Sequence, residues 1–245
     1  MSARAIERRL RALGDRDRAE HHKRFFRTGP GQYGEGDRFL GVTVPGIRAV
    51  ARELKDVGID TLAGLLQSPW HEARLLALVL LVRAYKRGDA AAREAVYRLY
   101  LANTHRINSW DLVDVSAADI VGAHLLDGDR ALLDRLARSE SLWERRVAII
   151  ATAHFIRRDQ FDDTLRIAAV LVDDRHDLIH KAVGWMLREV GKRDRAAEER
   201  FLRRYASRMP RTMLRYAIER FPAPLRTRYL TWPTANDSSR PPRRN

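Results

Sequence analysis

The sequence predicts an all-α fold, built as a HEAT-like helical-repeat solenoid with a concave basic surface. Apolar residues recur at intervals of three and four along most of the chain, whereas two-residue alternation of β-branched residues is nearly absent. The expected helices follow one another in pairs with short joins, often at Gly or Asp, as in an αα-hairpin array. Because the pairs share little sequence identity, an irregular helical bundle remains the alternative.

Capping residues and prolines divide the chain into its expected helices. Ser2 caps the first helix, Pro45 opens the third, Asp60 caps the fourth, Pro69 opens the fifth, and the sixth follows Asp89. The expected helices cover residues 2–13, 17–27, 45–57, 60–67, 69–86, 89–103, 109–125, 129–138, 141–157, 162–172, 177–190, 195–207 and 210–220. The longest irregular stretch lies between the second and third of them, over residues 28–44.

Composition predicts one repeat domain, residues 1–231, followed by a disordered basic tail, residues 232–245, which is rich in Pro, Ser and Arg. The chain has no Cys, which excludes disulfides, a thiol nucleophile and Cys-based metal sites. No apolar run approaches the ~18 residues of a membrane span, and no signal peptide opens the sequence. We therefore expect a cytoplasmic protein with no membrane partner.

The charge of the chain is the first indication of its function. Lys and Arg number 46 against 32 Asp and Glu, which gives a formal net charge of +14. Such a basic balance favours a polyanionic partner such as nucleic acid, although an Arg-rich surface without a specific partner has the same composition. It disfavours a role as a protein-binding scaffold.

Two apparent motifs do not support a cofactor or a metal. The stretch Gly29–Gly34 fits the letters GxGxxG, but no strand precedes it and no good helix follows, so it is a loop near a ligand or only a connector. His21 and His22 follow Glu20, yet adjacent histidines point about 100° apart on a helix and lack a convergent third ligand. We expect no cofactor and no metal.

The helix expected at 177–190 carries an aromatic residue that its core stripe does not explain. Trp185 falls off the stripe, on the flank shared with Lys181 and Arg188. An aromatic ring among cations is typical of a surface that stacks on and follows a nucleic-acid backbone, although packing on a neighbouring repeat explains Trp185 equally well. The core stripe itself comprises Ile179, Ala182, Val183, Met186, Leu187 and Val190.

The helix expected at 109–125 places a carboxylate among apolar neighbours. Asp114 lies one turn after Trp110, and an unpaired charge there would cost several kcal/mol, so it needs a partner or a function. Arg146, on the largely apolar helix 141–157, is a suitable partner for Asp114 or for a phosphate. A buried ion pair between the two is the structural alternative. Asp111 is explained by its position in the first helical turn after Ser109, where its negative charge interacts favourably with the helix dipole.

At these residues the sequence resembles the AlkD-like bacterial DNA alkylation-repair glycosylases, which are built from HEAT-like repeats. The resemblance covers about residues 5–225. It is carried by Ser109–Asp114, Leu142–Ile149 and Lys181–Glu189, and the Gly-rich stretch Tyr33–Val42 adds to it.

The resemblance implies a monofunctional glycosylase that releases N3-methyladenine or N7-methylguanine from duplex DNA. We also expect a monomer. It implies that Asp114 is the catalytic carboxylate and that Trp110 and Trp185 form aromatic walls. It also implies that Arg146 holds the DNA backbone and that Phe25 stands where the family's better-known form has Tyr, keeping the ring but losing one hydroxyl.

The other cations expected to bind DNA are Lys181, Arg188 and Arg145. The alternative function is a non-catalytic HEAT-like module that binds unusual DNA structures or RNA through the same surface.

Overall fold

A computed structural model describes residues 1–231 of the chain. These residues form helices and turns, with no strand among them and one isolated bridge between Arg38 and Trp70. The predicted all-α class is confirmed. The tail expected at 232–245 lies outside the described residues. None of the helices between residues 1 and 231 is long and apolar enough to cross a membrane.

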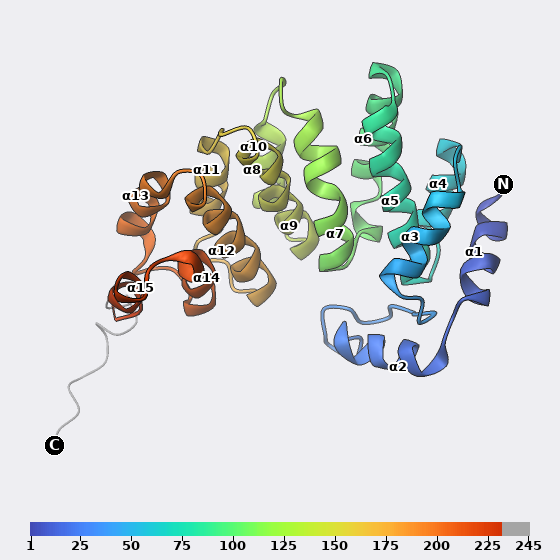
Figure 1. The fold of residues 1–245 in the computed structure, drawn as a ribbon, viewed down its shortest axis with the longest axis horizontal. Coiled ribbons are helices and arrows are strands. Elements are labelled where there is room, and N and C mark those ends of the chain that lie inside the picture. The colour runs from blue at the N-terminus through green and yellow to red at the C-terminus, as the bar shows by residue number, and fades with distance from the viewer. Residues whose placement is uncertain (232–245) are drawn as a thin grey trace. The chain divides into compact units, whose positions relative to one another are not determined.

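The chain folds as two compact units, the first ending at His124 and the second beginning at Leu125 (Figure 1). We refer to them as unit 1 and unit 2. The elements of unit 1 are α1 (Ala3–Ala12), α2 (Arg16–Phe25), α3 (Val44–Glu53), α4 (Ile59–Leu66), α5 (His71–Arg87), α6 (Ala90–Ala102), the 3-10 turn Thr104–Arg106, α7 (Trp110–Ala117) and the π-helical turn Ala118–Gly122.

Helix α5 forms the centre of unit 1. It packs against α3, α4, α6 and α7, and it is apolar on nearly every side, as a helix surrounded by others must be. Its buried residues include Leu76, Leu78 and Leu81. Its first turn carries His71, Glu72 and Arg74, which are also buried. Polar groups in such a position need partners, and they are supplied by the candidate site described below.

Helix α12 has the same central role in unit 2. It packs against α9, α11, α13 and α14. All six residues of the stripe predicted from its periodicity are buried, so that prediction is confirmed. The elements of unit 2 are α8 (Ala131–Ala137), α9 (Leu142–Ala151), α10 (Ala153–Ile156), α11 (Asp162–Val170), α12 (Asp177–Gly191), α13 (Arg195–Tyr205), α14 (Arg211–Ala217), the 3-10 turn Ile218–Arg220 and α15 (Ala223–Leu230).

The helix starts follow the capping signals in part. Ser2 accepts a hydrogen bond from the Ala5 amide, as predicted for the cap of α1. The prediction for α4 is wrong, because the cap is Gly58 and Asp60 lies in the first turn. The prediction for α5 is also wrong by two residues, since the chain remains extended at Trp70 after the proline and the helix begins at His71.

Two differences from the predicted helices occur in unit 2. The helix expected at 141–157 is interrupted at Thr152, whose hydroxyl donates to the Ile149 carbonyl at 2.7 Å and so competes with the regular helical bonds. Helix α15 lies beyond the last expected helix, which ended at residue 220, and prolines 222 and 224 occupy its cap and first turn.

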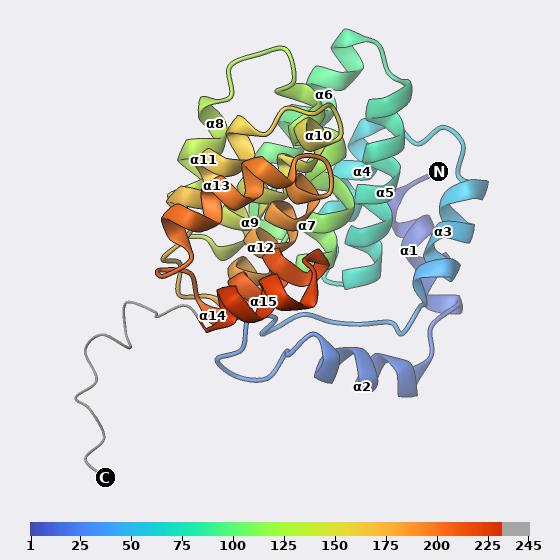
Figure 2. The ribbon, with the colours of Figure 1, turned by 60° about the vertical axis from the view of Figure 1, so that its left-hand side comes forward.

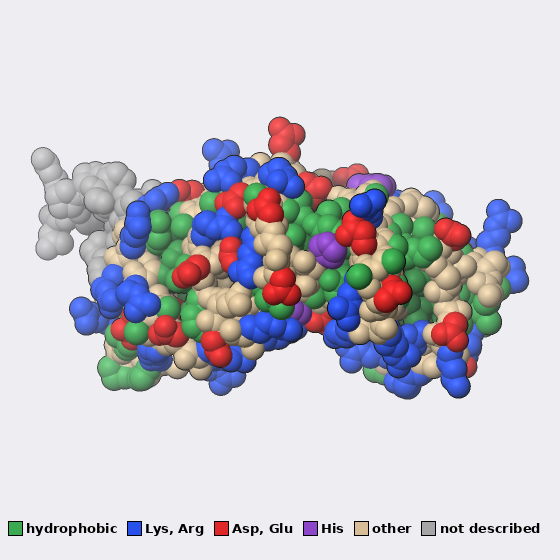
Figure 3. All heavy atoms as spheres, turned by 90° about the horizontal axis from the view of Figure 1, so that it is seen from above, with side chains coloured by type: hydrophobic (Ala, Val, Ile, Leu, Met, Phe, Trp, Pro, Cys, Tyr) green, Lys and Arg blue, Asp and Glu red, His purple; other side chains and the backbone are tan. Residues whose placement is uncertain are grey.

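On the face shown in Figure 3, Lys and Arg side chains of both units are interspersed with Asp and Glu. Many of these cations form ion pairs, such as Arg166 with Asp163 at 2.6 Å and Lys86 with Asp119 at 2.7 Å. The excess positive charge is therefore distributed, and a candidate site has to be identified from its geometry.

Candidate functional site

The first turns of α7 carry the residues that the sequence singled out in unit 1. Trp110 is the first residue of the helix, and Asp114 follows one turn later on the same face. Both side chains are half-buried. Asp114 lies near the buried hydroxyl of Tyr100: burial, together with the negative charge of Asp114, raises the pKa of Tyr100 above its ordinary value, despite a hydrogen bond from Ser116.

Trp110 belongs to a cluster of aromatic rings that comes from three segments. Phe26, just after α2, stacks on Trp110 with ring centroids 5.4 Å apart and an interplanar angle of 18°. The ring of Phe39 stacks on Phe26 at 5.1 Å, and Phe25 meets Trp110 edge-on at 5.9 Å. The structure thus brings Phe25 and Trp110, which the sequence analysis singled out separately, into contact.

Helix α2 is held beside this cluster by a few close contacts. Figures 1 and 2 show it at one end of unit 1, with its axis across those of the other helices. Gly41 has a positive φ of 79°, and a Cβ there would lie 2.0 Å from the Asp15 carbonyl, so only glycine allows this approach. The Gly41 carbonyl also accepts a hydrogen bond from Arg18 at 2.9 Å.

A buried carboxylate holds the segment that runs under α2. Glu72 accepts hydrogen bonds from the amides of Leu40 at 2.9 Å, Gly41 at 2.8 Å and Val42 at 3.3 Å. His22, on α2, has its Nδ1 3.7 Å from the same carboxylate. The negative charge of Glu72 therefore fixes the backbone on which α2 rests.

Beneath the aromatic cluster, His71 joins two carboxylates that lie far apart in the sequence. Its Nδ1 lies 3.0 Å from Asp37, and its Nε2 lies 2.8 Å from Asp111. A carboxylate at each ring nitrogen requires two N–H donors, which only the imidazolium ion has. Burial alone would lower the pKa of His71, but Asp111 and Asp37 outweigh it and raise that pKa to about 9.

The two carboxylates are shifted in the opposite direction. Burial alone would raise the pKa of Asp37, yet His71 and Arg74 hold it below its ordinary value. Burial likewise opposes ionisation of Asp111, and the charge and hydrogen bond of His71 hold its pKa low. The predicted explanation of Asp111 as a helix-dipole residue is therefore incomplete, because its main partner is His71 on α5.

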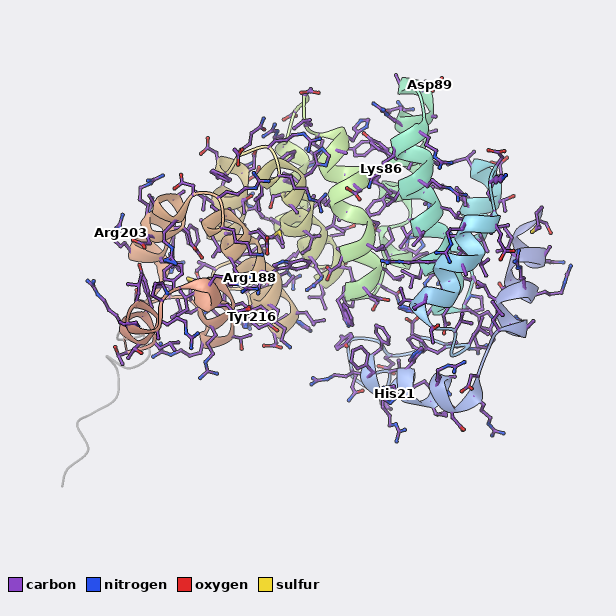
Figure 4. The ribbon with its side chains drawn as sticks, in the orientation of Figure 1. His21, Lys86, Asp89, Arg188, Arg203 and Tyr216 are labelled. Atoms are coloured by element: carbon purple, nitrogen blue, oxygen red, sulfur yellow. The ribbon has the colours of Figure 1, made fainter. Side chains whose placement is uncertain are left out.

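These residues surround a cavity of about 350 Å³, which lies within unit 1. Its walls are aromatic and aliphatic, and its lining includes the polar groups of His71, Glu72 and Asp111. Helix α2 contributes His21, His22 and Phe25 (His21 is labelled in Figure 4). Phe25 is 57% exposed and Val44 is 49% exposed, so apolar side chains at the cavity remain open to solvent. We call this space the α2 cavity.

The predicted site residues of unit 2 lie on α12 and α9. Trp185 is half-buried and off the core stripe, and its Nε1 donates to Glu189 at 3.1 Å. Lys181 pairs with Asp177 at 2.7 Å, while Arg188 pairs with Glu219 (Arg188 is labelled in Figure 4). Because these partners are partly exposed carboxylates, phosphate groups can compete for the same cations.

The two arginines predicted on α9 are more enclosed. Arg146 is only 5% exposed and donates to the Leu178 carbonyl at 2.6 Å, which ties α9 to the start of α12. Arg145 donates to Asp174 at 2.7 Å and to the Glu140 carbonyl at 2.8 Å. Each guanidinium thus has a structural role within unit 2, and the DNA contacts of both remain predictions.

Several residues of the α2 cavity were not identified from the sequence. Phe26 and Phe39 carried no signal beyond being aromatic residues in or beside the irregular stretch. His71 and Glu72 lie at the start of a long helix with a run of apolar residues, and charged residues in such a place were the signal that the sequence offered. Asp37 gave no comparable indication, because acidic residues are common in loops.

Comparison with known proteins agrees with this fold. The sequence model of a family described as DNA alkylation repair enzyme matches residues 6–221. None of the curated proteins matches the sequence. A solved structure from Enterococcus faecalis, described as a predicted DNA alkylation repair enzyme, shares the fold with a TM-score of 0.67 and 16% identity, covering 86% of this chain and 98% of that one. Because the family match spans most of its length, the chain belongs to the DNA alkylation repair enzyme family.

Proposed function

We propose that this protein is a monofunctional DNA glycosylase that hydrolyses the N-glycosidic bond of cationic alkylated purines in duplex DNA. The observation that carries the proposal is the position of Asp114 one turn after Trp110, in a chain that belongs to this family. The net charge of +14 supports DNA as the partner. N3-methyladenine and N7-methylguanine are the proposed lesions.

The chemistry suits a site whose main group is a carboxylate. An N-alkylated purine already carries positive charge, so it departs with the bonding electron pair as a neutral base and needs no general acid. The sugar then develops positive charge at C1′. A carboxylate about 4 Å away, at an effective dielectric constant of about 20, stabilises that charge by roughly 4 kcal/mol, or about three decades of rate.

Water completes the reaction by adding its oxygen to C1′ and losing a proton. In the proposal Asp114 orients this water and accepts the proton, which leaves an abasic site on an intact strand. Trp110 and Trp185 contact the cationic nucleotide, each contributing about 0.5 to 2 kcal/mol. Phe25, whose ring meets Trp110 edge-on, adds a further aromatic contact in this proposal.

In the same proposal, the cations of unit 2 contact the DNA backbone. Lys181 and Arg188 exchange their partly exposed carboxylate partners for phosphates. Arg145 and Arg146 are also proposed to contact the backbone, but their guanidinium groups are half-buried and buried, respectively. Phosphate contacts of this kind position the duplex and carry no sequence information. We therefore expect binding that depends strongly on salt and little on sequence.

The decisive experiment measures the base released from methylated duplex DNA by the wild type and by Asp114→Asn. The matched control is Asp119→Asn, which alters another carboxylate just beyond α7 that pairs with Lys86. We expect Asp114→Asn to release base about a thousandfold more slowly and Asp119→Asn to resemble the wild type. Equal release by Asp114→Asn and the wild type would exclude the catalytic role, and DNA binding without any release would favour a non-catalytic module.

A further inference from the structure

Helices α11 and α13 of unit 2 leave a groove between them. Each of the two helices packs on α12, but they make few contacts with each other, and a space of about 580 Å³ remains between them. Its lining is drawn from α11 and α13 alone, and we call it the α11–α13 groove. None of the residues proposed above for the reaction or for DNA contact lines this groove. It therefore needs an explanation of its own.

The groove has an apolar strip along its length. On α11, Leu165 and Ala169 lie one turn apart on one face and are only half-buried. On α13, Ala197, Phe201 and Tyr205 follow one another at intervals of one turn, and the rings of Phe201 and Tyr205 pack with their centroids 4.6 Å apart. At 1.5 Å per residue, this strip is about 12 Å long. It matches the apolar face of a short helix in length and in spacing.

The charged side chains of the groove are all positive. Among residues 1–231, three arginines and no Asp or Glu line it. Arg166, from α11, is compensated by acidic residues of unit 2. Arg200 has a side chain that is 62% exposed, and its guanidinium lies as far as 4.0 Å from Asp194. Arg204 is exposed and lies 5.3 Å from the centre of the Tyr205 ring. The groove thus presents two accessible cations beside its apolar strip.

We propose that the α11–α13 groove binds an acidic amphipathic helix of a partner protein. Apolar side chains one turn apart on that helix cover the strip, and the Asp or Glu residues that flank them pair with Arg200 and Arg204. A DNA duplex offers phosphates for the two arginines but no apolar group for the strip. The chain's own segment 232–245 carries three Arg and one Asp, so its charge has the wrong sign for this groove.

Fluorescence anisotropy with two synthetic peptides tests this inference on the intact chain. The first is a labelled helix of about 15 residues, with leucines at the i, i+4 and i+7 spacing and glutamates beside them. The second has glutamine in place of every glutamate. We expect the first peptide to bind with a dissociation constant of about 10 to 100 µM, as is usual for a small interface, and the second to bind at least about tenfold more weakly. Equal affinities, or no saturable binding of the glutamate peptide, would overturn the inference.

Variants of α11 and α13 assign the peptide to this groove. Arg204→Glu replaces an attraction by a repulsion and should weaken binding of the glutamate peptide about tenfold. Arg203→Glu is the matched control, because Arg203 is the next residue on α13, has a 57% exposed side chain and does not line the groove (Figure 4). Ala169→Trp fills the groove from α11 and should abolish binding. The same loss in both arginine variants, or full binding by Ala169→Trp, would contradict the proposed location.

The same variants separate a protein partner from two other occupants. Titrations with labelled duplex and single-stranded DNA should show equal, small losses of affinity in Arg203→Glu and Arg204→Glu, because each variant changes the net charge alike. A loss of DNA affinity confined to Arg204→Glu would assign the groove to nucleic acid and overturn the inference. Sedimentation velocity tests for a second copy of the chain: a dimer that Arg204→Glu dissociates and Arg203→Glu does not would also overturn it. Base release by Ala169→Trp should equal that of the wild type.

Discussion

Replacing His71 by glutamine tests whether a buried imidazolium ion holds α5, α7 and the 28–43 segment together. The change keeps a polar side chain but removes the positive charge between Asp37 and Asp111. The pKa of His71 is raised to about 9 from 6.5, and each pKa unit is worth about 1.4 kcal/mol, so the charged ring contributes about 3 kcal/mol to the free energy of unfolding.

The sign of the pH dependence follows from the direction of that shift. A group with a raised pKa in the folded state stabilises fully below its unfolded pKa, and the contribution disappears as the pH rises through the folded value. The free energy of unfolding of the wild type should therefore exceed that of His71→Gln by about 3 kcal/mol at pH 6, and by less than about 1 kcal/mol at pH 9.5. Urea denaturation at the two pH values measures both differences.

Two further measurements make this reasoning refutable. The ring protons of His71, followed by NMR, should titrate near pH 9. The control variant is His105→Gln, because His105 is exposed; its free energy of unfolding should stay within about 0.5 kcal/mol of wild type. Adding Asp111→Asn to His71→Gln removes the unpaired carboxylate and should restore part of the lost stability. A stability difference that does not vary with pH, or a ring that titrates near 6.5, would refute the buried ion pair.

Three other predictions concern separate features. Gly184→Ala would place a Cβ 2.4 Å from the Met213 carbonyl and should lower the stability of unit 2 by about 1 to 3 kcal/mol in thermal denaturation, whereas Gly128→Ala, with no atom near its Cβ position, should have little effect. Gly41→Ala should displace α2, which increased tryptic cleavage within that helix would report; unchanged cleavage would contradict the role of this contact. Burial raises the pKa of Glu198 to about 8, so the stability of the wild type should fall as the pH rises between about 4.5 and 8. Glu198→Gln lacks this ionisation, so in urea denaturation its free energy of unfolding should rise relative to wild type by about 1.4 kcal/mol per pH unit in that window.

The parts of this fold that the sequence predicted correctly depend on local spacing. The buried stripe of α12 follows from a period of 3.6 residues, and Ser2 caps α1 because the hydroxyl and the amide it bonds are three residues apart. The errors arise where two local signals compete. Prolines 222 and 224 can end a helix or begin one, and here they begin α15, whose Tyr229 is buried.

In the candidate site, too, the sequence predicted the local relations between residues and missed the long-range contacts. Trp110 and Asp114 could be paired from sequence because both lie on one helix, four residues apart. The contact between His71 and Asp111 joins residues 40 positions apart, and nothing in either local segment specifies the other. Asp111 was therefore assigned to the helix dipole, an explanation that fits any acidic residue in a first turn.

The non-local contacts also explain why a charged anchor suits this place better than an apolar one. Trp110 is stacked on Phe26 on one side, and its backbone neighbour Asp111 is bonded to His71 below. Stacking alone tolerates sliding and rotation of the rings, since it depends weakly on angle. The His71 imidazolium is directional: it donates one hydrogen bond to Asp37 and one to Asp111, and the second bond fixes the position of the first turn of α7 relative to α5. Because Asp114 lies one turn further along the same helix, the anchor that orients Trp110 also sets the position of the proposed catalytic carboxylate.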